Sequence, residues 1–473
     1  MTHIKVLYLK PNFSLEKVIS AQFLLTSGNF FGNYRLSVPA IMAQISSIIM
    51  QYIDAGMVGS LGADATASIG IVSSTTWLIN GIGMACAAGF AVQVAQYVGA
   101  GNDEKARSTM RQSLLLCTLA SAVLSVAAVL ISSRLPHWLN GTEAVCVLAT
   151  QYFFVYGCSL FFVLNRMLAS NMLQCAGDMK TPSLLNILLC ALDVVFNSFF
   201  IFYLDLGVLG AALGTACSEI VISAAMFYKM AFSSPILTLK KTGSWKWKAE
   251  TLKSAFAIGA PIALEHTVLN TAQIVIVGII APLGTVAVAA NSLAVTAESL
   301  CYMPGYGIGS AATTLVGQSV GAKDMDAVRS YANLSVFLGV AIMSVSALAM
   351  YMAAPLLFDM MTSDGQVRAL GTMVLRIEAF AEPFFAASIV IAGALRGAKD
   401  TLVPSLINLA TMWGIRITLS MALAPVYGLP GVWFAMAFEL FARGCLFFYR
   451  LFSMRWLRME RSVEKMEKSC EIR

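Results

Sequence analysis

Charged residues are scarce in this chain of 473 residues: Asp, Glu, Lys and Arg together make up 12% of it, whereas hydrophobic residues make up 58%. Soluble domains carry about 25% charged residues, so the chain has about half the charge that a water-facing surface needs. A soluble enzyme with a membrane anchor is therefore excluded. Because one spanning helix uses about 20 apolar residues, the hydrophobic residues suffice for about twelve spans.

Histidine is scarcer still, with three residues, of which only His266 lies deep in an apolar run. Membrane enzymes that use histidine clusters for metal binding or acid–base chemistry cannot be built from one histidine. The ten cysteines contain no CxxC pair and mostly stand singly in apolar runs, as small buried hydrophobic residues do. The net charge of +6 requires no nucleic-acid partner, because basic loops at a membrane surface account for it. We expect neither an enzyme nor a cofactor.

Apolar runs long enough to cross a membrane occur twelve times, with most charges between them. They lie at 34–59, 69–97, 112–133, 147–173, 182–203 and 208–229, and again at 254–280, 288–318, 331–354, 369–394, 404–424 and 429–450. We therefore predict an all-α integral membrane protein with twelve transmembrane helices. Its expected parts are an N-terminal segment 1–33, a six-helix bundle 34–229, a basic linker 230–253, a second six-helix bundle 254–450 and a tail 451–473.

Basic residues predict the orientation in the membrane. The linker from Lys229 to Lys253 holds six lysines against one acid, Glu250. Loops on the same side and the tail add Lys105, Arg107, Arg111, Lys180, Lys323, Arg329, Arg396, Lys399, Arg450, Arg455, Arg458 and Arg461. The opposite loops offer Arg134 and Arg368. Since cytoplasmic loops carry the excess of Lys and Arg, both termini are expected in the cytoplasm, at a plasma (inner) membrane of bacterial or archaeal type.

The second half of the sequence repeats the first at a constant offset, which is the distance in sequence from Pro39 to Pro261. Further matches at this offset include Gln96 with Gln318, Gly99-Ala100 with Gly321-Ala322, Asp178 with Asp400 and Asn186 with Asn408. Because six helices return the chain to the side on which it started, both copies enter the membrane from the same side. Two such parallel repeats are expected to enclose a central cleft that opens alternately to the two sides, which is the architecture of a transporter.

Several motifs resemble one family of transporters. The segment LSVPAIMAQISSIIMQYIDAGMVGSLGADATASIG (Leu36–Gly70) resembles the first helix of the multidrug and toxic compound extrusion (MATE) family, part of the multidrug/oligosaccharidyl-lipid/polysaccharide flippase superfamily. MPGYGIGSAATTLVGQSVGAKD (Met303–Asp324) is similar to the eighth helix of that family and the loop after it. LRGAKDTLVP (Leu395–Pro404) and LQCAGDMKTP (Leu173–Pro182) resemble the loops after its tenth and fourth helices.

The resemblance covers about residues 23–450 and implies a secondary antiporter that exports organic, often cationic compounds in exchange for sodium ions or protons. The alternative is a flippase of the same superfamily for lipid-linked oligosaccharides or peptidoglycan precursors. Such a cargo carries pyrophosphate and requires several cations in the cavity. Arg416, about 18 Å into its helix from Pro404, is the one good candidate. We therefore favour an antiporter for a small amphipathic cation, acting as a monomer among membrane lipids.

Asp54, Asp193 and Asn197 are the main candidates for the coupling site, because ionisable residues inside a membrane are costly. Asp54 lies about 22 Å along its helix from Pro39, and Asp193 and Asn197 lie about 16 and 22 Å from Pro182. We expect the three to converge. Their oxygens suit a sodium ion, whereas crowding of two carboxyl groups favours a proton on one of them. Interhelical hydrogen bonding is the alternative role.

The repeat and the family pattern both bear on this site. Ile276 and Ile415 stand at the positions that repeat Asp54 and Asp193, so only the first half has the carboxylate pair. The archaeal-type pattern of the family has the asparagine before the aspartate in this helix. Here the order is reversed, and the separate roles of Asp193 and Asn197 stay open.

The second half carries other ionisable residues in its helices, namely Glu265, His266, Glu298, Glu378 and Glu382. Another branch of the family has acids in helices seven and ten, and these are not carried over, because Leu269 and Phe385 stand at the matching places. Glu265, His266, Glu298 and Glu382 are candidates for a substrate or proton site. For Glu265 the alternative is a structural pair with a cation, and for His266 a hydrogen-bonded core position. Glu219, Arg376, Glu439 and Arg443 are interpreted as structural pairs.

Proline and glycine mark possible points of movement. Pro39 and Pro261 lie inside predicted helices, where proline removes a hydrogen bond and bends the helix, so we expect a bend or a gate at both. The GA-x-D/N turns after several helices are interpreted as simple connections that end one helix before the next begins, with the glycine forming the helix C-cap. Gating at these turns is the alternative.

Overall fold

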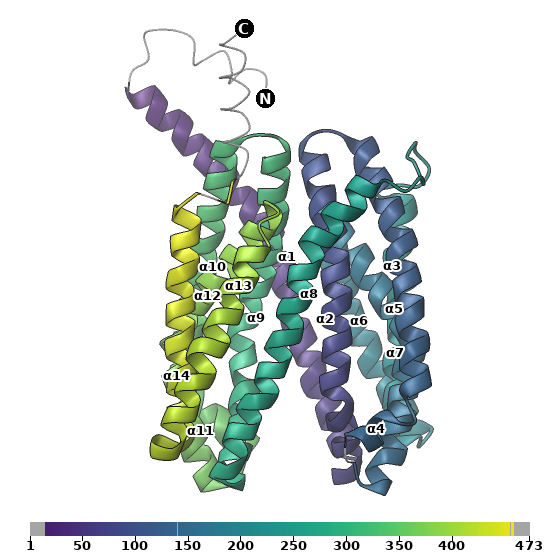
Figure 1. Ribbon diagram of the computed structural model, residues 1–473, viewed down its shortest axis with the longest axis vertical. Helices are drawn as coiled ribbons and strands as arrows, with labels where there is room; N and C mark the ends of the chain where they lie inside the picture. The colour runs from purple at the N-terminus through teal and green to yellow at the C-terminus, as the bar shows by residue number, and fades with distance from the viewer. Residues whose placement is uncertain (1–14, 140, 455, 458–473) are drawn as a thin grey trace.

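The computed structural model describes residues 15–139, 141–454 and 456–457, and over these residues the chain forms helices and short connections without a strand (Figure 1). The first half contains α1 (Leu15–Gly59), α2 (Ala63–Gly99), α3 (Asp103–Ile131), α4 (Leu135–Trp138), α5 (Glu143–Cys175), α6 (Lys180–Ser198), the π-helical η2 (Phe199–Tyr203), α7 (Gly207–Tyr228) and the π-helical η3 (Lys229–Ser233). The second half contains α8 (Ala249–Ile280), the 3₁₀ turn η4 (Ala281–Leu283), α9 (Thr285–Gly321), α10 (Met325–Met361), α11 (Gly365–Ala379), α12 (Glu382–Gly397), α13 (Leu402–Thr411), the π-helical η5 (Met412–Ile417) and α14 (Thr418–Phe452).

The described helices account for the twelve predicted spans. Ten stretches are long and apolar enough to cross a membrane. One of them, Leu402–Phe452, holds two spans, because Gly428 leaves the helical conformation at φ 62° and ψ −144°. Helices α11 and α12 are too short to cross separately, at 15 and 16 residues, but only Phe380 and Ala381 divide them. The predicted all-α, twelve-helix fold is confirmed.

The ends of the predicted chain differ in detail from the described structure. Helix α1 already begins at Leu15, within the segment 1–33 that the sequence placed before the first span. Arg455, Arg458 and Arg461 of the expected basic tail lie outside the described residues.

The two halves repeat each other helix by helix, in the register found in the sequence. Pro39 and Pro261 lie inside α1 and α8. The offset between them also separates the ends of α5 and α12, which are Cys175 and Gly397. The halves form two bundles side by side (Figure 1). At their junction α1 and α2 of the first bundle pack against α9 and α8 of the second.

Small residues allow this junction to be tight. A side chain on Gly89 of α2 would overlap the carbonyl oxygen of Ala255 in α8, and one on Gly259 of α8 would meet the carbonyl oxygen of Ala85 in α2. Small residues are the usual means by which membrane helices approach closely. The two bundles therefore meet backbone to backbone along α2 and α8.

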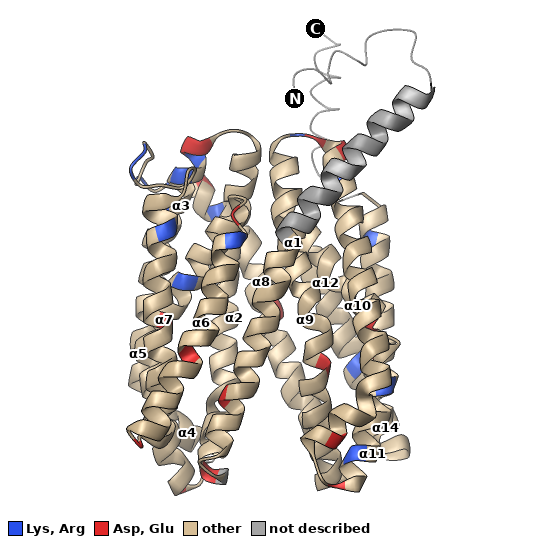
Figure 2. Ribbon diagram, turned by 180° about the vertical axis from the view of Figure 1, so that it is seen from behind, with Lys and Arg blue, Asp and Glu red and all other residues tan. Residues whose placement is uncertain are grey.

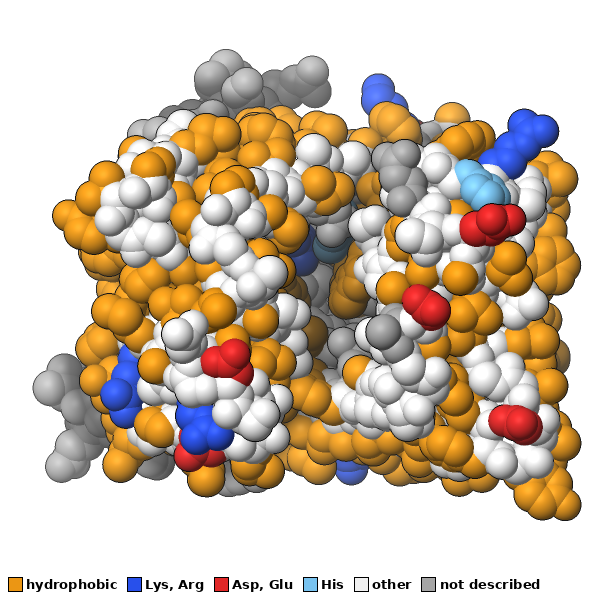
Figure 3. All heavy atoms as spheres, turned by 90° about the horizontal axis from the view of Figure 1, so that it is seen from below, with side chains coloured by type: hydrophobic (Ala, Val, Ile, Leu, Met, Phe, Trp, Pro, Cys, Tyr) orange, Lys and Arg blue, Asp and Glu red, His pale blue; other side chains and the backbone are white. Residues whose placement is uncertain are grey.

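A hollow opens between the bundles at one end of the molecule (Figure 3). This is the end at which α4 and α11 lie, opposite the end at which α2, α5, α9 and α12 finish (Figure 1). Lysines and arginines gather in and beside the loops at that opposite end (Figure 2). Lys105 and Lys180 lie in the first turns of α3 and α6, and Lys323 and Lys399 lie in the turns after α9 and α12. The cleft predicted between two repeats is thus present and opens away from the basic loops.

The basic linker is fastened to the first bundle. Arg107 of α3 donates from Nε to the carbonyl oxygen of Thr242 at 2.7 Å, and Arg111 donates from Nη2 to that of Lys241 at 2.6 Å and from Nη1 to that of Gly243. Both arginines are buried. The linker is therefore an ordered part of the first half rather than a loose tether.

The GA-x-D/N turns differ from the prediction. In each turn the residue with a left-handed backbone conformation is the one just before the Asp or Asn, namely Gly101 (φ 69°), Gly177 (φ 95°), Lys323 (φ 58°) and Lys399 (φ 65°). Gly99 and Gly321, the expected caps, end their helices without this conformation. They serve close packing instead, because a side chain on either would overlap the backbone of Gln318 or Gln96 across the junction. The C-cap interpretation of these two glycines was wrong.

Candidate functional site

Asp54, Asp193 and Asn197 lie together inside the first bundle. Asp54 comes from α1, and the other two lie one turn apart on α6. Asn197 donates from Nδ2 to Oδ1 of Asp54 and to Oδ2 of Asp193, both at 3.0 Å. One amide nitrogen thus bridges the two carboxylates. The structure brings together the three residues that helix rise placed at similar depth.

The charges of this pair are not neutralised by a described neighbour. Asp193 is fully buried and Asp54 is half-buried, and no described basic residue forms an ion pair with either. Arg166 of α5 donates to both carboxylate oxygens of Glu219, at 2.6 and 3.0 Å. Two carboxyl groups without a counter-charge in a low-dielectric interior favour a bound cation or a proton.

Oxygen atoms dominate the surroundings of the pair. Ser218 of α7 donates to Oδ1 of Asp193 at 3.2 Å. The Oδ1 atom of Asn197 is buried without a hydrogen-bond partner, and it lies against Gly214 of α7, where a side chain would overlap it. Two carboxylates with hydroxyl and amide oxygens form a ligand set for a hard cation. The unpartnered amide oxygen fits such an ion, which it would reach by rotation of the Asn197 amide.

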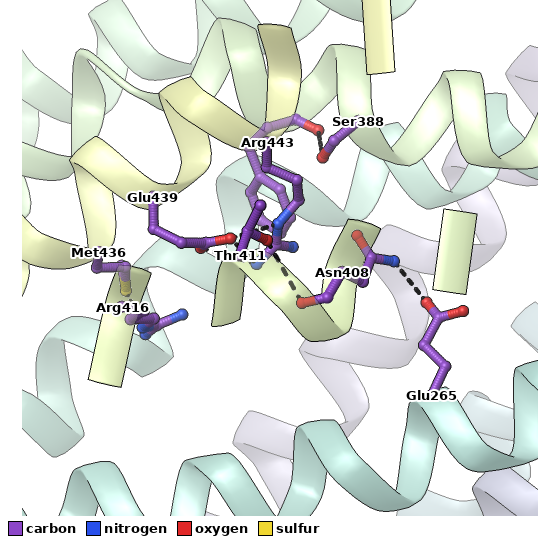
Figure 4. A network of polar contacts seen from close by, with 9 residues as sticks. Glu265, Ser388, Asn408, Thr411, Arg416, Met436, Glu439 and Arg443 are labelled. Atoms are coloured by element: carbon purple, nitrogen blue, oxygen red, sulfur yellow. Dashed lines mark hydrogen bonds and ion pairs between the residues drawn. The ribbon is translucent and has the colours of Figure 1, made fainter. Parts of the chain in front are cut away.

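The four candidates of the second bundle fall into two sets. Glu265 of α8 accepts a hydrogen bond at 2.7 Å from Asn408 of α13 (Figure 4). It accepts another at 2.7 Å from Ser405, and Arg396 forms an ion pair with it at 3.4 Å. This is the structural pairing that the sequence left open for Glu265. His266 lies at the junction of the bundles, where a side chain on Gly81 of α2 would overlap it.

The second set is a cluster of three buried acids, Glu298 of α9, Glu378 of α11 and Glu382 of α12. Their carboxylate oxygens lie within 4.8 Å of one another. Both oxygens of Glu378 and of Glu382 are buried without a hydrogen-bond partner. Arg416 of η5 is an electrostatic neighbour of Glu298 and Glu378, but it forms no ion pair in the described chain. Crowding and burial disfavour simultaneous ionisation of the three carboxyl groups, which makes the cluster a candidate site for protons or a cation.

Glu378 is the residue of this cluster that the sequence expectation omitted. Its spacing of four residues from Glu382 would place both on one face of a continuous helix, which is a signal that could have found it. In the structure the two acids stand on either side of the break between α11 and α12. The contribution of Glu298 from α9 has no such signal. The predicted pair of Glu439 and Arg443 is present on α14, with oxygen and nitrogen 2.7 Å apart (Figure 4).

Among the hydrogen bonds that join the bundles at the end opposite the hollow, two are related by the repeat. Gln96 of α2 donates from Nε2 to the carbonyl oxygen of Gly397, the last residue of α12, at 3.1 Å. Gln318 of α9 donates from Nε2 to that of Cys175, the last residue of α5, at 3.0 Å. Each bond satisfies a carbonyl that a helix end leaves free. Donors and acceptors both obey the offset of the repeat, and we call these four residues the glutamine latch.

Known proteins resemble the chain along most of its length. The family model described as MatE matches residues 39–199 and 261–422. The two ranges begin at Pro39 and Pro261, which are related by the repeat. Among sequence relatives, the probable multidrug resistance protein NorM of Thermotoga maritima is 25% identical over 93% of this chain and 95% of its own length.

Solved structures share the fold. A mutant of VcmN, a MATE transporter of Vibrio cholerae, superposes with a TM-score of 0.85 at 19% identity and covers 91% of this chain and 98% of that one. A transporter of the MOP superfamily from Pyrococcus furiosus, described as having a binding pocket of reverse polarity, has a TM-score of 0.85 at 18% identity over 92% of this chain and 97% of that one.

Proposed function

Because the chain belongs to the MatE family, whose members are transporters rather than enzymes, we propose that it is a multidrug efflux transporter that exchanges organic compounds for a cation. The observation that carries the proposal is the pair of acids Asp54 and Asp193, bridged by Asn197 inside the first bundle. The second bundle holds Ile276 and Ile415 at the repeated positions. An acid pair in one repeat only is a specialised site and not a requirement of the fold.

The orientation follows from the basic loops. The linker lysines lie at the end of the glutamine latch, and the positive-inside rule assigns that end to the cytoplasm. Both termini are then cytoplasmic, and the hollow faces the outside. This conformation is one of the two that an antiporter alternates between, with the cytoplasmic end closed by the latch. Since one chain encloses the whole hollow, we propose that the protein works as a monomer in a lipid membrane.

Asp54 connects ion binding with movement of the bundles. Two residues before it on α1, Tyr52 donates from its hydroxyl to the carbonyl oxygen of Thr296 on α9, at 2.8 Å. Helix α1 therefore joins the coupling site to the opposite bundle. An ion shifts a conformational equilibrium only by its difference in affinity for the two states. Neutralisation of Asp54 and Asp193 supplies that difference, because it removes the repulsion that holds α1 and α6 apart.

Bending at Pro39 of α1 and Pro261 of α8 accompanies this movement in the proposed cycle. Each proline lies inside its helix and removes one backbone hydrogen bond from it. Both helices lie at the junction of the bundles. The two prolines are therefore the points at which α1 and α8 can change direction while the rest of each bundle stays packed.

Sodium and protons require different orientations of the Asn197 side-chain amide. Its Nδ2 faces both carboxylates, so a sodium ion between them requires the amide to turn and present Oδ1. A proton on Asp54 or Asp193 leaves the amide where it is. The coupling site for either ion consists of Asp54, Asp193 and Asn197, and for sodium these three are also the metal ligands.

The second bundle offers a further site for protons or for the cationic group of a substrate. Glu298 and Glu382, with Glu378, form a buried acidic cluster that needs positive charge. Glu265 and His266 have a different position, because Glu265 is already hydrogen-bonded by α13 and His266 contacts α2. We propose that these two control access between the bundles, and that the acidic cluster selects amphipathic cations.

The flippase alternative requires free cations for a pyrophosphate. Among the described residues, the interior arginines Arg166, Arg396 and Arg443 form ion pairs with Glu219, Glu265 and Glu439. Arg416 has no such pair in the described chain, and the buried Arg107 and Arg111 donate to carbonyl oxygens of the linker. The reverse polarity described for the Pyrococcus furiosus transporter belongs to that protein, and the acids found here favour a cationic cargo.

Transport by the purified protein in proteoliposomes tests the proposal. A fluorescent cationic dye is loaded, and its movement is followed under a sodium gradient and, separately, under a pH gradient. We expect one of the two gradients to drive dye export. If neither gradient moves the dye and a lipid-linked oligosaccharide is flipped instead, the antiporter proposal is wrong.

A further inference from the structure

Arg376 lacks the structural ion pair that the sequence predicted for it. It lies on α11 and donates from Nε to the carbonyl oxygen of Tyr351 on α10 at 3.3 Å. Its guanidinium also lies 5.1 Å from the centre of the Tyr351 ring. No acid of the described chain forms an ion pair with it, and its two terminal amino groups donate to no described residue. A formally charged group at this place is left with free hydrogen-bond donors.

The guanidinium lies in a groove of about 720 Å³ between α10, α11 and α14. These helices form the outer edge of the second bundle, away from the first (Figure 1). The lining is mostly apolar and includes five exposed aromatic rings, namely Tyr351, Phe380, Phe434, Phe438 and Phe441. Arg376 is the one charged residue of its lining. The groove therefore combines an apolar channel with a single positive charge.

The level of Arg376 in the membrane follows from the charges that flank α10. Arg329 and Asp359 lie near the two ends of this helix, about 45 Å apart along it, which matches the thickness of a bilayer including its headgroups, about 40–45 Å. Tyr351 lies about 12 Å inward from Asp359. Arg376, which is bound to Tyr351, is thus at the edge of the hydrocarbon core. From there an arginine side chain reaches the phosphate level by extending outward.

The repeat shows that the six-helix unit does not need this charge. Phe154 of α5 stands at the equivalent position of the first repeat and is 47% exposed. A charge that faces lipid is costly unless it finds a partner. Since the described chain supplies no acid, the partner must come from the surroundings. At this depth the anion that a membrane supplies is the phosphate of a phospholipid.

We propose that the groove between α10, α11 and α14 binds one phospholipid of the leaflet on the side of the hollow. Arg376 receives the phosphate, to which the planar guanidinium offers two parallel donors. One acyl chain lies along Phe434, Phe438 and Phe441. The site is separate from export, because an arginine repels the cationic compounds proposed as cargo. It rests on the membrane location of the chain and not on the transport direction or the coupling ion.

Counting of bound lipids tests this proposal. The purified full chain is delipidated in detergent, phosphatidylglycerol is titrated in, and bound molecules are counted by native mass spectrometry. We expect Arg376→Gln to weaken binding of the first lipid about tenfold, the loss typical of a charge-assisted pair. The matched control is Arg368→Gln on the same helix, because Arg368 is paired with Asp359 at 2.9 Å and lies outside the groove. This control should bind as the wild type does.

Two more experiments separate the contribution of the phosphate to lipid binding from that of the acyl chains. Diacylglycerol, which has no phosphate, should bind the wild type and Arg376→Gln equally. Phe438→Ala should weaken both lipids while Arg376 is intact, and this variant carries the test if Arg376→Gln does not fold. Equal phosphatidylglycerol affinity in the wild type and Arg376→Gln overturns the proposal. An equal loss of phosphatidylglycerol affinity in Arg368→Gln also overturns the proposal, since it indicates general attraction of the lipid to a positive surface. Formation of a dimer that excludes the lipid from the groove overturns it as well.

Discussion

Gln96 and Gln318 stand at equivalent positions of the two repeats, and each donates a hydrogen bond to the last carbonyl of a helix in the opposite bundle, at 3.1 and 3.0 Å. The contacts that close the end of the molecule away from the hollow therefore include a pair with the symmetry of the repeat. Neither bond can persist if the bundles separate at this end. The latch is thus a stabilising feature of the present conformation alone.

Removal of the latch should favour the opposite conformation. One hydrogen bond contributes about 1 kcal/mol, so Gln96→Ala or Gln318→Ala should raise the population open at the latch end about fivefold. Spin labels placed at the beginnings of α3 and α10 would report this as a larger share of long distances. The control is Gln151→Ala, because Gln151 is exposed near the beginning of α5, away from the end of this helix at which Cys175 accepts the latch bond. Unchanged distance distributions in both latch variants would refute this role.

Two lysines whose backbone is in the left-handed conformation should each destabilise the folded protein slightly. Lys323 and Lys399 have φ of 58° and 65°, where the first repeat has Gly101 and Gly177. A residue with a side chain in this conformation is strained by about 1 kcal/mol, and part of the gain from its removal is offset because glycine makes the unfolded chain more flexible. Lys323→Gly and Lys399→Gly should each stabilise the protein by about 0.5 kcal/mol. Thermal unfolding in detergent measures this, and Lys→Ala at the same positions, which removes the charge but keeps the strained Cβ, should give no gain.

Gly214 should be needed for the coupling site. A side chain there would overlap Oδ1 of Asn197, and overpacking of this kind costs about 1–3 kcal/mol. Gly214→Ala should lower the melting temperature and the efflux rate together, because it displaces the amide that bridges Asp54 and Asp193. Gly278→Ala in α8 is the control, since nothing lies within 4 Å of that position. A fully active Gly214→Ala protein would contradict the observed packing.

The acids of the second bundle should respond differently to neutral replacement. Glu382→Gln mimics a protonated acid within a crowded cluster, so the protein should keep its melting temperature while efflux falls. Glu439→Gln should be strongly destabilising, by about 3–5 kcal/mol, because it leaves the buried Arg443 without its partner. Thermal unfolding and dye efflux of both variants provide the comparison. Equal destabilisation by the two changes would show that Glu382 is an ordinary structural ion.

The sequence was sufficient for those features that depend on distance along the chain. The repeat offset predicted the pairing of helices, and the helix rise predicted that Asp54, Asp193 and Asn197 lie at one depth. How each helix is rotated about its own axis, and hence which neighbours its side chains meet, cannot be derived from distances along the chain. For that reason the meeting of Glu298 with Glu378 and Glu382, the unpaired state of Arg376 and the cross-bundle bonds of Gln96 and Gln318 emerge only from the structure.

The turns illustrate a second limit. The pattern GA-x-D/N suggested that its glycine forms the cap, yet the left-handed residue is the third one, and two of the four are lysines. Gly99 and Gly321 are instead required by a helix from the other half of the chain. A glycine needed for packing and a glycine needed for a turn cannot be told apart in one sequence.

Coupling at Asp54 is the central claim, and efflux by Asp54→Asn in proteoliposomes tests it most directly. Dye export is measured under the gradient that drives the wild type, beside Asp64→Asn, which changes an exposed acid at the beginning of α2. We predict that Asp54→Asn loses gradient-driven export by about tenfold or more, since a proton transfer group or ion ligand contributes at least that much, while Asp64→Asn exports normally. Gradient-driven export by Asp54→Asn at the wild-type rate would contradict this claim.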